Sequence, residues 1–256
     1  MDKAKYEISG RKIFFLYPQS AVLENMLPQL SIHEYEVYVL SDHEKARAVL
    51  RANQDSILFI NIDTILSPDA WKEYVRSCFS DNSLKSTLFG VITNNGDPAV
   101  KKYYTDFGVQ CGVISIRKGV EESLKQITAV LEEKKAKGLR KYVRVNCEND
   151  TMASINFMES GIRRQMKLRD ISSVGFSSFF KEEVDYLPSQ NTIIRDIQLT
   201  LRGTLIRCNA VVYGVKEIEG HKVYVMLFTK EMEPITKSKI QTYIRNYLQS
   251  IVDAIK

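Results

Sequence analysis

RRQMKLRDIS at residues 163–172 and GFSSFF at 175–180 have the composition of two short strands with turn residues between them. Further segments rich in β-branched and aromatic residues lie on both sides of this pair. They are YVRVN (142–146), ASINFM (153–158), IIRDIQLTL (193–201), LIRCNAVVYGVKEI (205–218) and KVYVMLF (222–228). So many short strands with turns between them predict a closed antiparallel β-barrel for the second half of the chain.

The chain ends in KSKIQTYIRNYLQSIVDAIK (237–256), which carries one apolar stripe at helical spacing. This pattern predicts a C-terminal helix that packs against the barrel or, alternatively, is offered to a partner. The stripe is made of Ile240, Tyr243, Ile244, Tyr247, Leu248, Ile251, Val252 and Ile255.

The first half, from Lys12 to about Leu131, alternates short apolar runs with longer amphipathic stretches. Predicted helices include HEKARAVLRAN (43–53) after an Asp42 N-cap, AVKKYYTDF (99–107) ended by Gly108, and VEESLKQITAVLEEKKAK (120–137) ended by Gly138. This alternation predicts βα units around a doubly wound parallel sheet. The five predicted strands are IFFLY (13–17), EVYVL (36–40), SILFINI (56–62), TLFGVIT (87–93) and CGVISI (111–116).

The fold class is therefore α/β plus all-β, with one domain at residues 11–137 and a second at 138–256. A chain of 256 residues, 44% of them hydrophobic, is long enough for two such cores. Residues 1–137 hold 18 Lys and Arg against 18 Asp and Glu, whereas residues 138–256 hold 18 against 13. The excess positive charge of the second half favours an anionic partner.

Targeting and cysteine patterns narrow the class of protein further. There is no apolar run of about 20 residues and no signal-like start, so we expect a cytoplasmic protein without membrane insertion. The four cysteines are too far apart in sequence for a CxxC pair or a metal knuckle, and we expect reduced thiols and no metal or cofactor. They are Cys78, Cys111, Cys147 and Cys208.

Two short motifs carry the functional prediction. LRKYVRV contains an RxxxR pattern at Arg140 and Arg144, and RDISSVGFS contains a DxSxxG pattern that begins about 26 residues after Arg144. In this order the two motifs resemble the ligand site of the PilZ family of cyclic di-GMP receptors. RxxxR by itself is unspecific, because Arg47 and Arg51 match it inside a predicted helix.

The resemblance implies an antiparallel barrel that binds cyclic di-GMP through Arg140, Arg144, Asp170, Ser172 and Gly175. Arginine can bind a phosphate, pair with guanine O6 and N7, or stack on the base. The Asp170 carboxylate can accept from the guanine N1 and N2 donors. Ser172 can donate to the ligand or to its own turn, and Gly175 allows a positive φ or a close approach to the ligand.

The first half resembles a response-regulator receiver domain, but it departs from the pattern of that family. The position of the phosphoacceptor aspartate falls on Asn61, with Asp63 two residues beyond as a displaced alternative. The acidic pair expected to hold Mg²⁺ is replaced by Tyr17 and Pro18.

The remaining receiver positions also depart from the pattern of that family, with one exception. Ser115 stands where a lysine is expected, with Lys118 nearby, and Thr93 alone fits its place. We therefore expect a pseudo-receiver that contacts a protein partner. Because the linker to Arg140 is short, ligand binding is expected to rearrange the two domains.

Other functions are considered alongside the receptor. His33, His43 and His221 are far apart and no catalytic motif lies near them, so we expect no enzyme. One alternative is a nucleic-acid-binding barrel that uses Arg163, Arg164, Lys167 and Arg169, although nucleic acid is not the expected partner. Another alternative is a ligand-free scaffold for protein interactions.

Overall fold

The computed structural model describes residues 9–182 and 184–255 and divides into two compact units. One unit runs to Lys141 and includes the residues from Gln249 onward, and the other is Tyr142–Leu248. The domain bounds taken from the sequence, 11–137 and 138–256, stay a prediction, because compactness alone does not show where a domain folds independently.

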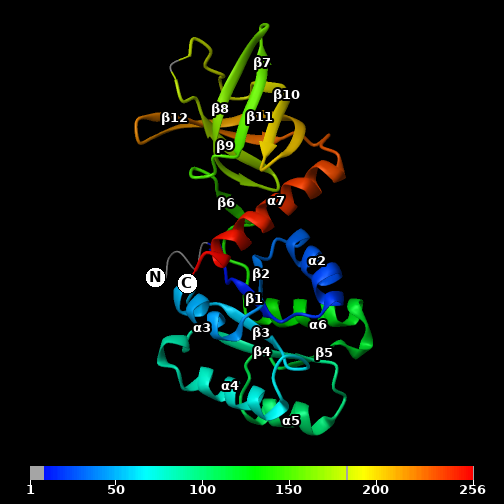
Figure 1. Cartoon of the computed structure of the whole chain (residues 1–256). Coiled ribbons are helices and arrows are strands. Elements are labelled where there is room, and N and C mark those ends of the chain that lie inside the picture. Colours follow the sequence, from blue (N-terminus) through cyan, green and yellow to red (C-terminus); the bar gives the residue numbers. More distant parts are fainter. Residues whose placement is uncertain (1–8, 183, 256) are drawn as a thin grey trace. The chain divides into compact units, whose positions relative to one another are not determined.

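The first unit is a parallel sheet with the strand order β2-β1-β3-β4-β5 (Figure 1). This is the flavodoxin-like order, and it confirms the predicted receiver-like α/β fold. All residues of β1 and β3 are buried, as expected of strands covered on both faces. The strands are β1 Ile13–Leu16, β2 Val37–Leu40, β3 Ile57–Asn61, β4 Leu88–Thr93 and β5 Val113–Ser115.

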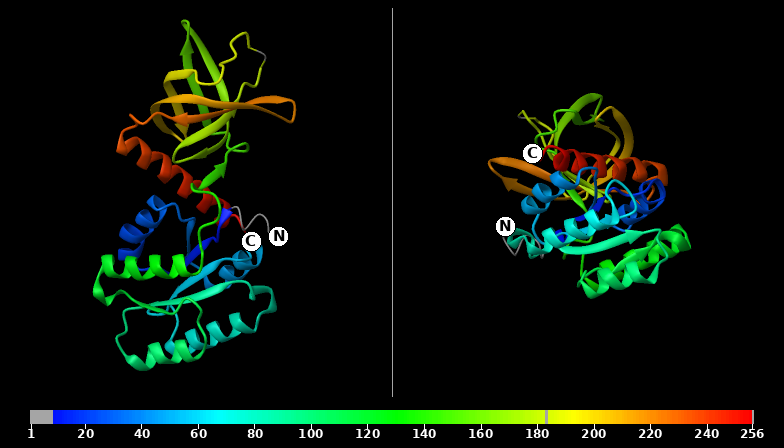
Figure 2. Two further views of the ribbon diagram at one scale, coloured as in Figure 1. Left: turned by 180° about the vertical axis from the view of Figure 1, so that it is seen from behind. Right: turned by 60° about the horizontal axis from the view of Figure 1, so that its bottom comes forward.

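Helices lie on both faces of this sheet (Figures 1 and 2). One core cluster joins Phe15 and Phe59 of the sheet to Leu30 of α2 and to Ile127 and Leu131 of α6. The other face carries α3, α4 and α5 (Figure 1). The helical elements are η1 Val22–Met26, α2 Leu27–Ile32, α3 His43–Ala52, α4 Pro68–Ser80, η2 Asn82–Leu84, α5 Pro98–Asp106, η3 Ile116–Lys118 and α6 Val120–Glu133.

Helix boundaries follow the predicted caps with one exception. Asp42 caps α3 by accepting from the backbone N–H groups of Glu44 and Lys45, as predicted. Helix α6 ends at Glu133, however, and not near Gly138. Lys135 has φ of 49°, and the carbonyl of Ala136 accepts a 2.8 Å hydrogen bond from the backbone N–H of Arg11. The chain leaves the helix because Ala136 packs into the core beside β1, where it is 3% exposed.

The second unit is an antiparallel sheet in the order β6-β8-β7-β10-β11-β12-β9, which the additional β8–β9 pairing closes into a six-stranded barrel with β6 beside β8. Every predicted strand is present, so the barrel prediction is confirmed. The strands are β6 Arg144–Asn146, β7 Ala153–Glu159, β8 Ile162–Ser172, β9 Gly175–Phe179, β10 Ile193–Leu201, β11 Thr204–Ile218 and β12 His221–Phe228.

Helix α7 (Pro234–Asp253) contributes the first part of its apolar stripe to the barrel core. Ile240, Tyr243, Ile244 and Tyr247 are at most 7% exposed there. The Tyr243 hydroxyl donates to Asp150 Oδ2 at 2.8 Å, and burial holds the pKa of Tyr243 well above its ordinary value. The stripe therefore packs on the barrel as predicted, whereas Ile251 remains 50% exposed.

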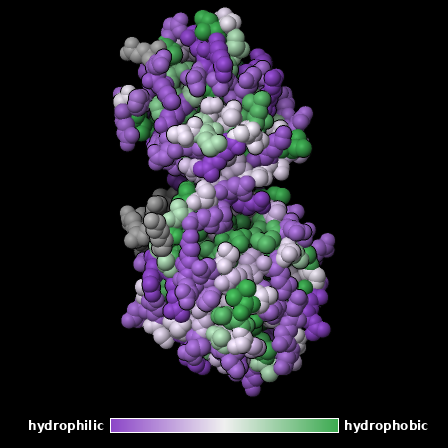
Figure 3. Space-filling model, viewed as in Figure 1, coloured by the Kyte–Doolittle hydropathy of each residue, from purple (hydrophilic) through white to green (hydrophobic). Residues whose placement is uncertain are grey.

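The surface in Figure 3 is mostly hydrophilic, with single hydrophobic residues and small patches between the charged ones. Large exposed apolar side chains of the barrel include Met158, Leu205 and Tyr213. Scattered residues of this kind are ordinary on soluble surfaces. Within residues 9–182 and 184–255, no helix has the length and apolar character that crossing a bilayer requires.

Candidate functional site

Pairing between β6 and β8 brings Arg144 of the first motif next to the second motif on the outer face of the barrel. Arg144 lies opposite Ser172, and Asn146 lies opposite Asp170. Val145 and Ile171, between these pairs, point into the core and are at most 1% exposed. Because side chains alternate along a strand, the side chains of Arg144 and Asp170 point outward.

The side chains of Arg144 and Asp170 approach each other without closing a tight ion pair. Arg144 Nε lies 3.5 Å from Asp170 Oδ1, which is longer than a good hydrogen bond. The Arg144 side chain is 48% exposed and that of Asp170 is 14% exposed. The site therefore presents a cation and a carboxylate side by side, with the cation open to solvent.

Ser172 and Gly175 shape the turn that follows Asp170. The Ser172 hydroxyl donates to the carbonyl of Gly175 at 3.1 Å, and Ser172 is 2% exposed. Of the two roles considered for this serine, the structure shows the hydrogen bond within the turn. A ligand contact of Ser172 stays a prediction.

Gly175 is required for a reason that the sequence did not reveal. Its φ is outside the left-handed range, so of the two roles considered for Gly175 the positive φ does not apply, and a close approach to the ligand stays a prediction. A Cβ atom at this position would lie 2.2 Å from the carbonyl oxygen of Met226. Gly175 pairs with Leu227 of β12, and the close approach of β9 to β12 excludes a side chain.

Two further residues surround Asp170: Ser177, which the sequence analysis did not name, and Arg169, which it named only for the nucleic-acid alternative. Ser177 lies opposite Asp170 on β9, and its hydroxyl donates to Asp170 Oδ2 at 2.6 Å. In a hairpin with a two-residue turn at Ser173–Val174, Asp170 and Ser177 fall opposite each other. The sequence therefore contained a signal for Ser177. Arg169 Nε lies 2.7 Å from Glu148 Oε1, and Arg169 Nη1 lies 3.8 Å from Asp170 Oδ2.

The position of Arg169 depends on a β-bulge. The register of β8 against β9 shifts between Leu168 and Asp170. Leu168 is buried at 1% exposure and points into the core. Strict alternation would therefore point Asp170 into the core as well and leave only Arg169 on the outer face. The extra residue at the bulge places both beside each other, and the sequence carries no clear signal for it.

Arg140 is exposed and lies in the segment that precedes β6. It belongs to the first unit, which ends at Lys141, whereas Arg144 belongs to the barrel. The structure thus brings Arg144, Asp170, Ser172 and Gly175 into one neighbourhood, and Arg140 is linked to them by a chain separation of four residues.

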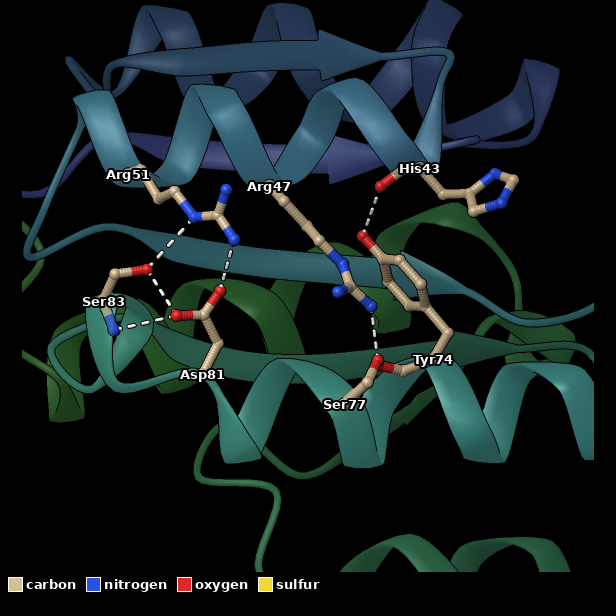
Figure 4. A network of polar contacts seen from close by, with 7 residues as sticks. All are labelled: His43, Arg47, Arg51, Tyr74, Ser77, Asp81 and Ser83. Carbon is tan, nitrogen blue, oxygen red and sulfur yellow. Dashed lines mark hydrogen bonds and ion pairs between the residues drawn. The ribbon is translucent and has the colours of Figure 1, made fainter.

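The second RxxxR match, in α3, has a structural role (Figure 4). Arg51 binds Asp81 Oδ2 at 2.7 Å and Ser83 Oγ at 3.1 Å. Arg47 donates to Ser77 Oγ and lies over the ring of Tyr74, 5.1 Å from its centroid. These contacts hold α3 against α4 and η2.

The basic run that suggested a nucleic-acid groove is partly neutralised by carboxylates of the barrel unit. Arg164 forms ion pairs with Glu159 at 3.2 Å and with Asp185 at 2.7 Å, and Arg169 pairs with Glu148. Two of the four cations in this run are therefore matched by carboxylates. Phosphate binding by these two arginines would require them to leave their carboxylate partners, and the nucleic-acid alternative stays a hypothesis.

At the carboxyl end of the parallel sheet, Asn61 acts as a link between loops. Its amide donates to the Tyr17 carbonyl at 2.7 Å, and its Oδ1 accepts from the backbone N–H of Asp63 at 3.1 Å. The Asp63 carboxylate accepts from the Thr93 hydroxyl, the backbone N–H of Asn94 and the side-chain amide of Gln19. Donors from the protein itself therefore hold both Asp63 oxygens.

The other receiver positions do not rebuild a metal site. Tyr17 contacts His43 Nδ1 through its hydroxyl at 3.0 Å, and Ser115 ends β5 with Lys118 exposed in η3. In the part of the chain that the structure describes, no three His, Cys, Asp or Glu side chains gather as metal ligands.

The four cysteines are free thiols, and three of them are buried. Burial raises the pKa of Cys111 to about 11 and that of Cys147 and Cys208 to about 12. Thiols with raised pKa values are poor nucleophiles at neutral pH. These cysteines therefore give no support to a thiol-based catalytic site.

Comparisons with known proteins give structural matches alone. No protein-family model and no curated protein matches the chain. Similar solved structures include YcgR from Escherichia coli in complex with c-di-GMP, with 13% identity over 46% of this chain and 49% of that one, and a TM-score of 0.38. The K. pneumonia MrkH–c-di-GMP complex has 18% identity, coverages of 44% and 52%, and a TM-score of 0.35.

A third similar structure is the Bacillus subtilis inhibitor of motility, MotI/DgrA, with 21% identity, coverages of 43% and 51%, and a TM-score of 0.34. The chain spans about half the length of these three proteins. Since these TM-scores are below 0.5, the likeness carries no weight for function.

Proposed function

We propose that residues 138–256 form a PilZ-type domain that binds cyclic di-GMP, and that the chain acts by binding and not by catalysis. The observation that carries this proposal is the convergence of two motifs about 26 residues apart in sequence. Strand pairing sets Arg144 beside Asp170 on the outer face of the barrel, with 3.5 Å between Nε and Oδ1.

The chemistry of this pair suits a ligand with guanines and phosphates. The exposed guanidinium of Arg144 can bind a phosphate or the O6 and N7 atoms of guanine. The Asp170 carboxylate can accept from the N1 and N2 donors of guanine, which a purely phosphate-binding site would not need. Arg140, four residues before Arg144, supplies a second cation to the same ligand in this proposal.

Isothermal titration of the whole chain with cyclic di-GMP, cyclic di-AMP and GTP tests the proposal. We expect saturable binding of cyclic di-GMP alone and its loss in Arg144→Ala and Asp170→Ala. Arg207→Ala is the matched control, because Arg207 is a barrel arginine with a 65% exposed side chain, 3.5 Å from Asp196. Absence of heat with every nucleotide would leave the barrel as a scaffold.

Ligand binding is proposed to reach a downstream process through a rearrangement of the two units or through a protein partner of the receiver-like unit. The segment between α6 and β6, residues 134–143, motivates this mechanism, because it contains Arg140. Small-angle scattering with saturating ligand should differ from that of the free chain. Identical profiles at saturation would exclude the rearrangement and favour a partner. The cytoplasmic location stays a prediction.

A further inference from the structure

The Asp170 carboxylate is held from one side by a serine that neither motif contains. Ser177 lies in β9 between Asp170 of β8 and Val225 of β12, paired with both. A residue paired on both sides in a sheet has little freedom of backbone movement. Ser177 is 4% exposed, so its side chain is enclosed as well.

The hydrogen bond between Ser177 and Asp170 is short and directed. The Ser177 hydroxyl donates to Asp170 Oδ2 at 2.6 Å, a length typical of hydroxyl groups bound to ionised carboxylates. A carboxylate offers about four lone-pair positions, and this bond uses one of them. Two parallel donors, such as N1–H and N2–H of guanine, would need one of the remaining positions on each oxygen.

Two arginines compete for the same carboxylate. Arg169 Nη1 lies 3.8 Å from Asp170 Oδ2, and Arg144 Nε lies 3.5 Å from Oδ1. Both ion pairs are longer than a good hydrogen bond, so a small rotation of the Asp170 side chain would shorten one of them into a hydrogen-bonded pair. The hydrogen bond from Ser177 opposes that rotation.

We propose that Ser177 is a positioning residue that holds the Asp170 carboxylate in the orientation required to read guanine. This inference rests on the proposed function and deepens it, because it assigns guanine selectivity to a third side chain. Loss of one such hydrogen bond is expected to weaken cyclic di-GMP binding about tenfold. The loss should act on the contacts to the guanine N1 and N2 donors and spare the phosphate contacts.

The neighbouring serine provides a matched control. Ser178 is the next residue of β9 and is fully buried, but its hydroxyl points inward, 3.5 Å from Met166 Sδ. Ser178→Ala removes the same atom from the same strand on the opposite face. Ser177→Thr keeps the hydroxyl and should bind within a fewfold of the natural protein. Melting temperatures of all variants separate affinity losses from unfolding.

The experiment is titration of the whole chain with cyclic di-GMP and with cyclic di-IMP, whose bases lack the 2-amino group. In the natural protein, cyclic di-GMP should bind more tightly. Ser177→Ala should lower the affinity for cyclic di-GMP about tenfold and narrow the ratio between the two nucleotides, whereas Ser178→Ala should change neither. In an Asp170→Ala background, Ser177→Ala should cause no further loss, because Ser177 acts through Asp170.

The inference fails if Ser177→Ala binds like the natural protein or loses affinity equally for both nucleotides. The second result would assign Ser177 a general structural role. If the natural protein itself binds neither nucleotide, the proposed function fails, and the inference fails with it. The ratio of the affinities for cyclic di-GMP and cyclic di-IMP in Ser177→Ala tests the role of Ser177 even where binding to the Asp170→Ala variant is too weak to measure.

Discussion

Two pairs of arginines in this chain have the same spacing and different surroundings. Arg47 and Arg51 lie one turn apart on α3, so their side chains extend from one helix face. Arg144 lies on the outer face of a strand, beside Asp170. Exposure does not distinguish the pairs, since the side chains of Arg51 and Arg144 are 54% and 48% exposed.

The difference lies in the partners. Arg51 closes a 2.7 Å ion pair with Asp81, whereas the atoms of Arg144 and Asp170 are 3.5 Å apart. Arg47 is engaged by Ser77 and by the ring of Tyr74. Tightly matched side chains stabilise the fold they belong to. Loosely matched charges on a surface keep their capacity for a ligand, and this contrast is consistent with the ligand site proposed at Arg144 and Asp170.

Removing both arginines of each pair tests the contrast most strongly. Arg140→Ala combined with Arg144→Ala is expected to lower the affinity for cyclic di-GMP by about 100-fold or more, because charge-assisted contacts to the ligand are lost. Arg47→Ala combined with Arg51→Ala should leave the affinity unchanged. Titration calorimetry measures both, and equal losses in the two double variants would contradict the assignment.

The glycine of the second motif is expected to have a large effect on stability. Gly175→Ala places a Cβ atom 2.2 Å from the Met226 carbonyl oxygen, and we expect destabilisation of the barrel by about 1–3 kcal/mol. Gly214→Ala is the control, because a Cβ there meets nothing within 4 Å. Urea unfolding followed by circular dichroism compares them. A stable Gly175→Ala variant that fails to bind would instead place Gly175 against the ligand.

Arg47→Ala should destabilise the first unit by about 1 kcal/mol, because it removes a hydrogen bond and a cation–π contact. Arg144→Ala should change the melting temperature very little, since its nearest carboxylate atom is 3.5 Å away. Thermal unfolding without ligand measures both. A larger effect for Arg144→Ala would show that Arg144 serves mainly the fold.

The smallest expected effect is a pH dependence in the first unit. Hydrogen bonds from Ser83 and then the Arg51 contact hold the pKa of Asp81 below its ordinary value of 3.8. A lowered pKa in the folded state stabilises the fold above the unfolded value, and this contribution is lost as the pH falls through the folded pKa. The melting temperature difference between the natural protein and Asp81→Asn should therefore be larger at pH 7 than at about pH 3. A constant difference would mean that Asp81 acts without its charge.

The sequence predicted much of the fold because its signals are local. Short apolar runs separated by capped helices indicated the parallel sheet, and β-rich segments with turns indicated the barrel. The α6 boundary was predicted too far along, since the residues at 134–137 have helical composition but Ala136 packs against β1. A tertiary contact decided that boundary against local propensity.

By itself, the sequence determined two fold classes and two motifs in a recognisable order, because periodicity and spacing are properties of neighbouring residues. Only the tertiary structure decided which arginines are already matched by carboxylates and why residue 175 must be glycine. It also placed Arg169 beside Asp170 through the bulge in β8, and Ser177 against the carboxylate. These features depend on contacts between strands, where a shift of one residue exchanges the faces of a sheet.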